Sequence, residues 1–529
     1  MEGLVNDLRR LVMAERQPTA IYLATELWRE ILSHLESPGL SAMRLVAREQ
    51  RGLANSFLFK SCILRISGPE GLHSKLAFYT SSAISHAVRD CTVLGGGRNT
   101  PTAVAEICAA LNQFKNLRHL TFQYVRMSPT TVAAIYTAAL PKDDLLSLVS
   151  LSLVSCITDF PASSGDEMSA IALKSVLIHN EHIPNFTHDY RWLSLLNLDL
   201  LQMLDLAQPH MTHIFIECLA QTPGMHLPML ESLQLHLSGL DYLMDKFLSV
   251  LTSFPSLRIF GVTAGPANTI GSYSRGHTRI AIPDDSLPLL TSFHGLVTHG
   301  AAYCAGRKLL LHLKLYDSQH NQASDSVILL PALQEIVRAA PQLRSLELRI
   351  AFPLEELTPT LASSLPTLRS LRVIVPCYPG RTILALDDAL RTLGMLVVPR
   401  DLEVLFIAYR VADRVPWSAM PNHSAEMVSA IRDLTQRVQT LQKICICCDL
   451  PNAWGWDDFA DRSDRTMVWL WTRRRHASEM VSQQTVAGAE CIDGRKTNLR
   501  IRAQDFQTYT AADALDDEWR VAAAAHRIA

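Results

Sequence analysis

The stretch "ILLPALQEIVRAAPQLRSLELRI", residues 328–350, predicts one complete structural unit. Its first part mixes apolar and polar residues, and we expect it to form a helix. Pro341 cannot continue that helix. Leu343, Leu346 and Leu348 follow at spacings of three and two residues, and a period of two places the last two leucines on the same face of a strand. The stretch therefore predicts a helix, a turn that contains Leu343, and a short strand.

The same turn and strand pattern recurs through the middle of the chain. Proline, any residue and leucine precede a strand-like run at Pro228, Pro255, Pro288, Pro341 and Pro366. Two apolar residues follow each leucine at the same spacings, except that Gly295 takes the last place after Pro288. Copies without the proline contain Leu117, Leu120 and Phe122; Leu148, Leu151 and Leu153; Leu173, Val176 and Ile178; Leu195, Leu198 and Leu200; Leu310, Leu313 and Leu315; and Leu402, Leu405 and Ile407. The helix, turn and strand unit is therefore repeated.

Stacking of one repeated unit favours a solenoid, which is an α/β fold with a curved parallel sheet on its concave face. The copies lie about 20 to 40 residues apart, whereas regular leucine-rich repeats recur every ~20 to 29 residues. The region from Leu117 to Leu450 thus resembles an irregular leucine-rich repeat array. A doubly wound sheet also alternates helices and strands and stays an alternative, although that fold has no reason to repeat one pattern before each strand.

The composition indicates a folded, soluble, intracellular protein. Lysine plus arginine number 49 and aspartate plus glutamate 51, so the formal net charge of -2 offers no bulk field to attract nucleic acid or an anionic membrane. Hydrophobic residues make up 48% of the chain, yet no continuous apolar run reaches the ~18 residues of a membrane span. The 11 cysteines are scattered, which is typical of reduced thiols. We expect a cytoplasmic or nuclear protein that binds neither nucleic acid nor membrane.

A short segment before the repeats, "ELWREILSHLESPGLSAMRLVARE" at residues 26–49, concentrates apolar side chains. Leu27, Ile31 and Leu35 lie four residues apart, which predicts one face of a helix. A second short helix is expected after Pro38, and a third leads to strand-like residues 61–66. Helices this short are not stable alone in water, so packing on one another or on a partner must hold them.

The whole segment from Leu23 to Leu64 resembles an F-box. The residues that match the family pattern are Leu23, Glu26, Leu27, Ile31, Leu35, Leu40, Leu45, Val46, Arg48, Leu53, Ala54, Leu58 and Phe59. The sequence departs from that pattern at Ala24, where proline is usual, at Ala47, where cysteine is common, and at Gln50 and Arg51, where an aromatic residue is usual. With irregular repeats behind this segment, the chain is similar to a large set of F-box proteins of filamentous fungi.

The resemblance implies a non-catalytic subunit of a Skp-cullin-F-box type ubiquitin ligase. The F-box would dock onto a Skp-type adaptor, and through it onto a cullin-RING ligase, while the repeats bind an unknown target protein. Such a receptor raises the effective concentration of a target lysine near a ubiquitin-loaded conjugating enzyme. The expected adaptor-binding set, divided between a small core and the Skp-facing surface, is Leu23, Leu27, Ile31, Leu35, Leu40, Leu45 and Val46. The alternative is a protein-binding scaffold with no ligase role, in which residues 20–66 only cap the repeats.

Other groups of reactive residues suggest no catalytic, cofactor or metal site. The glycines at 95–97 lack the lysine and hydroxyl residue of a phosphate-binding loop. Cys445, Cys447 and Cys448 have no second pair at zinc-finger spacing and are expected as buried thiols of a strand. The histidines of "HNEHIPNFTHDY", residues 179–190, are expected in a polar loop, with a metal site as the alternative.

Four regions follow from these patterns. Residues 1–19 are expected to form a leader helix, 20–66 the F-box-like helical segment, 67–450 the leucine-rich-repeat-like solenoid, and 451–529 a C-terminal cap and tail. The last region contains four tryptophans beside three consecutive arginines, Arg473–Arg475. We expect these residues to cover the last repeat, with contact to a partner as the alternative.

Overall fold

Helices and strands alternate along two compact units, Met1–Leu148 and Val149–Ala529, in the computed structural model. The structure describes residues 25–35, 37–46, 48–66, 69–95, 101–139, 148–158, 171–179, 193, 196–222, 226–237, 244–263, 282–283, 286–316, 326–349, 354–375, 395–410, 420–449 and 466–472. The expected leader helix, residues 1–19, and most of the expected C-terminal region, 451–529, lie outside these residues.

The described part of unit 1, residues 1–148, begins with three helices, α2 (Thr25–Ser33), α3 (Ser37–Val46) and α4 (Arg48–Leu58). The elements that follow are β1 (Ser61–Arg65), α5 (Pro69–Tyr79), β2 (Asp90–Leu94), α6 (Pro101–Leu111), β3 (His119–Gln123), β4 (Arg126–Met127) and α7 (Pro129–Ala139). Strands β1, β2 and β3 pair in parallel, with buried Cys62, Cys91 and Leu120 in register. Short helices therefore lie where the apolar spacing predicts them, and a parallel sheet follows.

Unit 2, residues 149–529, repeats the strand and helix alternation. Its described strands are β5 (Ser150–Val154), β6 (Ile157–Thr158), β7 (Ser175–His179), β8 (Met203–Leu206), β9 (Ser232–His236), β10 (Ile259–Thr263), β11 (Ser292–Leu296), β12 (His312–Tyr316), β13 (Ser345–Arg349), β14 (Ser370–Val375), β15 (Val404–Arg410), β16 (Lys443–Asp449) and β17 (Thr466–Thr472). Its described helices are the 3-10 turns η1 (Leu198–Leu200) and η3 (Leu251–Ser253) and the α-helices α9 (Pro209–Gln221), α10 (Met244–Val250), α11 (Val297–Cys304), α12 (Ser326–Ala339), α13 (Leu354–Ser364) and α15 (Met420–Arg437).

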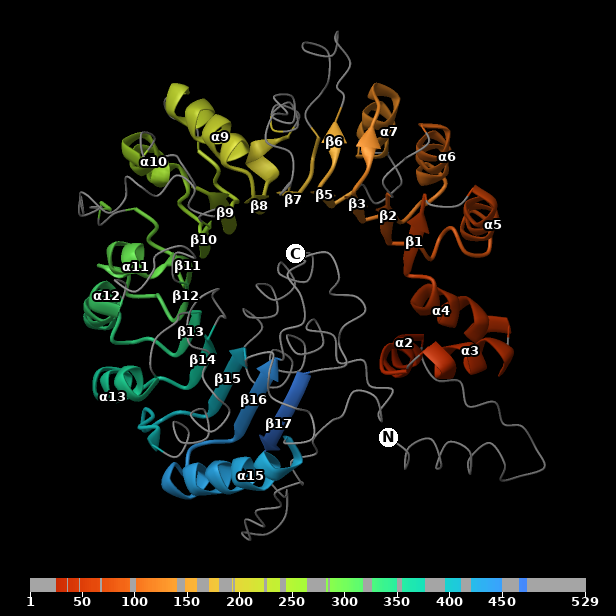
Figure 1. The fold of residues 1–529 in the computed structure, drawn as a ribbon. Coiled ribbons are helices and arrows are strands. Elements are labelled where there is room, and N and C mark those ends of the chain that lie inside the picture. Colours follow the sequence, from red (N-terminus) through yellow and green to blue (C-terminus); the bar gives the residue numbers. More distant parts are fainter. Residues whose placement is uncertain are drawn as a thin grey trace, which may run out of the picture. The chain divides into compact units, whose positions relative to one another are not determined.

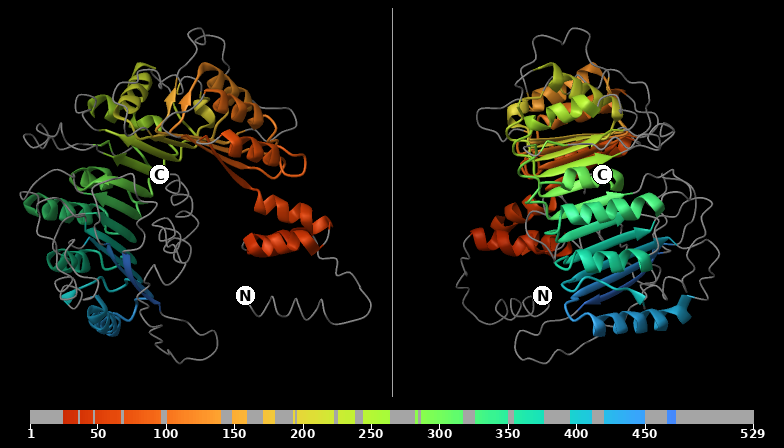
Figure 2. Two further views of the ribbon diagram at one scale, coloured as in Figure 1. Left: turned by 45° about the vertical axis from the view of Figure 1, so that its right-hand side comes forward. Right: turned by 90° about the vertical axis from the view of Figure 1, so that its left-hand side faces the viewer.

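The main sheet of unit 2 follows the order of the sequence, from β5 through β7 to β16, with every neighbouring pair parallel. The last strand, β17, runs antiparallel to β16. Helices α9 to α15 lie on the outer side of the curve that these strands describe (Figures 1 and 2). A doubly wound sheet would reverse its strand order and carry helices on both faces. The fold is therefore a repeat-type solenoid with a long parallel sheet, and the doubly wound alternative is excluded.

The repeated apolar positions form the core between sheet and helices. The second position of the pattern is at most 2% exposed in eight repeats of unit 2, where it is filled by Leu233, Phe260, Phe293, Leu313, Leu346, Leu371, Leu405 and Ile444. Neighbouring residues of this row are register partners. The leucine of each proline-containing turn is buried as well, and Leu343 is 1% exposed. Because each fully buried side chain of this kind contributes about 1.5–3 kcal/mol, the pattern stabilises the stack at every repeat.

One repeat lies in a different register from the predicted one. Leu198 and Leu200 belong to the 3-10 turn η1 and not to a strand, and Leu200 is 44% exposed. The side chain of Asn197 accepts a hydrogen bond from the backbone N–H of Asp199 and caps this turn. The strand begins at Met203, and the pattern residues are Leu201, Leu204 and Leu206, all fully buried. The prediction was wrong here because the leucine-rich stretch contains two series with the same spacing.

Candidate functional site

The three N-terminal helices enclose a small core of their own. Leu32 of α2, Leu40 of α3 and Ala54 of α4 are buried together, one from each helix. Partly buried side chains pack around this cluster: Leu35, Met43, Leu53, Phe57 and Leu58. The helices are too short to be stable singly, so this shared core is what holds them.

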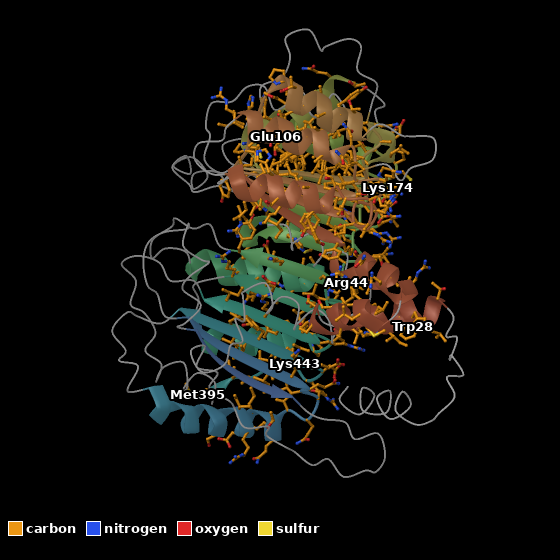
Figure 3. All side chains as sticks on the ribbon, turned by 90° about the vertical axis from the view of Figure 1, so that its right-hand side faces the viewer. Trp28, Arg44, Glu106, Lys174, Met395 and Lys443 are labelled. Atoms are coloured by element: carbon orange, nitrogen blue, oxygen red, sulfur yellow. The ribbon has the colours of Figure 1, made fainter. Side chains whose placement is uncertain are left out.

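The expected adaptor-binding residues divide into core and surface. Leu40 is buried and Leu35 packs against the core, while Ile31 is half-buried. Leu27 is 54% exposed on α2, and Leu45 is 84% exposed near the end of α3. Leu23 lies outside the described residues, and Val46 is described only as the last residue of α3. Figure 3 labels Trp28 of α2 and Arg44 of α3, the neighbours of the two exposed leucines in the sequence.

An aromatic cluster joins these helices to the first repeat of unit 1. The Arg44 guanidinium carbon lies 5.0 Å from the ring centroid of Phe59, which follows α4. The Phe59 ring meets Phe78 edge to face at 5.3 Å, and it meets Tyr79 in the same way at 6.5 Å. Both partners end helix α5, so the helical segment is packed against the repeat that follows it.

A second candidate surface is the face of the unit 2 sheet that points away from the helices, here named the inner face. The buried pattern residues of β8, β9, β11 and β12 face the helices, because α9 contacts β8 and β9 and α11 contacts β11 and β12. The residues between them point to the inner face. Register places the central row of this face at Leu177, Asp205, Gln234, Gly261, His294, Lys314, Glu347, Arg372 and Phe406. The row is largely polar.

Ion pairs neutralise one end of the central row. One carboxylate oxygen of Glu347, Oε1, lies 3.4 Å from Nζ of Lys314, and the other, Oε2, lies 3.4 Å from a terminal nitrogen of Arg372. The Arg372 guanidinium carbon also lies 4.6 Å from the Phe406 ring centroid. The Glu347 side chain is only 7% exposed, so its charge depends on these two cations.

Asp205 is the other acidic residue of the row, and its surroundings differ. Its Oδ1 atom is enclosed but has no hydrogen-bond partner. Burial raises the pKa of the Asp205 carboxyl to about 6, although nearby His179 acts in the opposite direction. Burial, together with His179, lowers the pKa of His236 to about 4, so His236 is neutral at pH 7. On strand β5 the enclosed hydroxyl of Ser152 also lacks a partner. The sequence analysis did not single out Asp205. Its sequence signal is an acidic residue between two buried leucines, Leu204 and Leu206.

The other predicted groups supply no site among the described residues. Two of the three glycines at 95–97 and most of the histidine-rich loop lie outside them. The three cysteines of 445–448 lie on strand β16 as predicted, with their side chains not described. Within the described ranges, no three His, Cys, Asp or Glu side chains are grouped so that they could hold a metal ion. None of the helices in those ranges is both long and apolar enough to cross a membrane.

Comparisons with known proteins add little to this description. No protein-family model matches the chain, and no curated protein matches it. Among solved structures, it is similar to a Bacteroides fragilis protein determined by a structural genomics consortium, with 10% identity and a TM-score of 0.24 over 64% of this chain and 73% of that one. A likeness at this score carries no inference about fold or function.

Proposed function

We propose that this chain is the substrate-recognition subunit of a Skp-cullin-F-box type ubiquitin ligase. Residues 20–66 would act as the F-box that docks a Skp-type adaptor, and the solenoid would bind the target protein. The proposal rests on the observation that the apolar residues of the F-box-like segment divide into a core set and an exposed set. The middle residues of this segment, such as Leu40, hold the three helices together, whereas Leu27 and Leu45 point to solvent.

The exposed leucines support docking because folding does not use them. An exposed leucine is common on proteins and needs no explanation alone. Here two stand on adjacent short helices, in a segment whose apolar spacing matches a known docking motif. Burying one leucine against a partner contributes about 1.5–3 kcal/mol, so two such contacts could anchor an interface.

No residue of this chain need perform chemistry in such a complex. The receptor holds a target so that one of its lysines lies near the conjugating enzyme, and the rate rises because the encounter becomes intramolecular. The polar inner face of the solenoid is the surface that we assign to the target.

The alternative function, a repeat-protein scaffold with no ligase role, is favoured by the contact of Phe59 with Phe78 and Tyr79. A cap needs such packing to cover the first repeat. Deletion of residues 1–60 separates the two functions, since it removes all three helices together with Phe59 and ends just before β1. Loss of adaptor binding with an unchanged solenoid supports the ligase role, whereas unfolding of the first repeats supports the cap.

Co-purification with a Skp-type adaptor tests the proposal directly. The wild-type chain should bind, and a Leu27→Asp, Ile31→Asp double variant should not. A wild-type chain that fails to bind where a known F-box protein does would contradict the ligase role.

A further inference from the structure

The charged side chains of strands β9 to β14 are gathered in one part of the inner face. These six strands contain four Asp, Glu, Lys or Arg residues: Lys314, Glu347, Arg349 and Arg372. All four alternate with the buried apolar residues of β12, β13 and β14, which are adjacent strands, so they point away from the helices (Figure 1). Three are basic and one is acidic, so this part of the sheet is positive on a chain whose formal net charge is -2.

The carboxylate of Glu347 does not exhaust the two cations beside it. Each of its oxygens lies 3.4 Å from one cation, Nζ of Lys314 or a terminal nitrogen of Arg372. Both distances are longer than the ~2.7–2.9 Å of a short charge-assisted hydrogen bond. An ammonium group has three N–H donors and a guanidinium group has five. Lys314 and Arg372 therefore have donors left for a second anion.

Arg349 holds a third positive charge close to this pair. It ends β13 two residues beyond Glu347, which places their Cα atoms about 6–7 Å apart on the same face. Within the described part of the chain, no carboxylate forms an ion pair with Arg349. Its register partners are Tyr316 on β12 and Ile374 on β14, and neither supplies a negative charge. The charge of Arg349 is therefore available to an external group.

The three cations, here named the basic cluster (Lys314, Arg349 and Arg372), are open to solvent. The side chains of Lys314 and Arg372 are 31% and 26% exposed, and Arg349 is exposed. Two histidines lie in the same part of the face, His294 in register with Lys314 and His312 on β12. Protonation would make these histidines cationic, so they add no negative charge. A partner can reach the basic cluster, and its neighbours compensate only part of its charge.

We propose that the basic cluster binds an acidic segment of the target protein, a stretch with closely spaced aspartate or glutamate residues. Carboxylates accept charge-assisted hydrogen bonds from lysine and arginine, and a guanidinium group can bind one with two parallel bonds. The cations lie on strands about 4.8 Å apart, so neighbouring side chains of one extended segment can reach them. The inference rests on the proposed function, because it names the chemistry of the target that the solenoid binds.

A peptide-display selection tests the inference without knowledge of the natural target. Random dodecapeptides are selected on the immobilised full chain, and synthetic copies of the clones are titrated by fluorescence anisotropy. The clones should contain more aspartate and glutamate than the unselected library. Their affinity should fall as the salt concentration rises, because exposed charges are screened over about 10 Å at 0.1 M salt.

Three variants of the full chain separate the cluster from general effects. Arg349→Gln removes an exposed cation and should weaken binding of the clones about tenfold or more. Arg344→Gln is the matched control, an exposed arginine just before β13 in the same repeat, and should change affinity less than about twofold. Glu347→Gln removes the one negative charge of the site and should make the clones bind more tightly than wild type. Opposite effects of two inner-face variants are not expected from a loss of folding.

Several results would overturn the inference. These are a library that yields no binders, clones without an excess of acidic residues, equal binding to wild type and Arg349→Gln, or an equal loss on Arg344→Gln. Peptides that bind only when their serines are phosphorylated would contradict a carboxylate ligand. A single-stranded oligonucleotide that displaces the clones and binds more tightly would identify a nucleic-acid site instead.

Adaptor binding measured on the same proteins keeps the two proposals apart. Arg349→Gln should bind a Skp-type adaptor like wild type, because Arg349 lies in unit 2 and outside the helical segment. A wild-type chain that binds acidic peptides but no adaptor contradicts the ligase role alone. A wild-type chain that binds the adaptor but no acidic peptide contradicts this inference alone.

Discussion

The ring of Phe293 fills the space in which a side chain at position 295 would lie. A Cβ atom placed on Gly295 would be 2.6 Å from Cζ of Phe293. That ring is stacked on buried Tyr303 at a centroid distance of 4.6 Å, so it cannot move aside. In this repeat Gly295 takes the third position of the pattern, which is apolar in the other proline-containing repeats. The ring of Phe293, at the second position, fills the space that an apolar side chain at position 295 would take.

Restoring the apolar pattern at this repeat should destabilise the protein. Gly295→Val has the residue type that other repeats carry, but its side chain would clash with Phe293, and overpacking of this kind costs about 1–3 kcal/mol. The matched control is Gly261→Ala on the adjacent strand, where the new methyl group meets only the flexible Gln234 side chain. Urea unfolding should show a lower midpoint for Gly295→Val alone. Equal midpoints for both variants would contradict the explanation.

The small core of the N-terminal helices should depend on Leu32. Leu32→Ala removes a fully buried side chain and should cost about 2–5 kcal/mol in the stability of α2, α3 and α4. Leu45→Ala, at an 84% exposed position, should change stability by less than about 0.5 kcal/mol. Hydrogen exchange of amides between residues 25 and 58 measures both. Slow exchange that survives Leu32→Ala would mean that these helices are held from elsewhere.

Ionisation of Asp205 should lower the free energy of unfolding as the pH rises from about 4 to about 6. Folding raises the pKa of this carboxyl from 3.8 to about 6, so the folded chain holds the proton more tightly than the unfolded chain. The cost is absent below about pH 4, grows through the interval between the two pKa values, and is full above about pH 6. His179 on β7 acts in the opposite direction to burial on the pKa of Asp205.

Asp205→Asn should therefore raise the free energy of unfolding at pH 7 by about 1–3 kcal/mol, and change it little below pH 4. Denaturant unfolding at several pH values measures the difference between variant and wild type. A variant that is less stable than wild type at pH 7 would show that the carboxylate has an internal partner.

Removal of the Glu347 charge should lower the free energy of unfolding, whereas removal of the Asp205 charge should raise it. Glu347→Gln leaves Lys314 and Arg372 without their shared anion, and we expect a loss of about 1–3 kcal/mol at pH 7. The loss should shrink when Lys314→Met is present, since one of the two uncompensated cations is then absent. A double-mutant cycle of these two substitutions gives the coupling energy. Zero coupling would exclude this ion pair as a source of stability.

Much of the solenoid could be predicted because its turns and strands repeat a strict spacing. Strand β2 escaped prediction although Val88, Cys91 and Val93 have that spacing, since no leucine or proline marks it. The register around Leu200 was ambiguous because leucines occur there at two equivalent offsets. The unpartnered Oδ1 of Asp205 could not be foreseen, because hydrogen bonding depends on side chains of neighbouring strands, which spacing along one strand does not encode.

The helical segment could be predicted as helices, but not the role of each side chain. Leu27, Ile31 and Leu35 are equally spaced, yet only the first is mostly exposed. The direction in which each one points depends on how α2 packs against α4, which the periodicity of a single helix does not determine.

The affinity of a surface double variant for the adaptor tests whether the helical segment docks a Skp-type adaptor. Leu27→Asp lies in the first turn of α2 and Leu45→Lys in the last turn of α3, where these charges suit the helix dipole and leave the fold intact. The control carries Met229→Asp and Leu289→Asp, at exposed apolar positions of unit 2. Calorimetric titration with a purified Skp-type adaptor should give binding for wild type and control, and a loss of about a hundredfold or more for the Leu27, Leu45 variant. Equal affinity of all three proteins for the adaptor, or no affinity of the wild type, would contradict docking through Leu27 and Leu45.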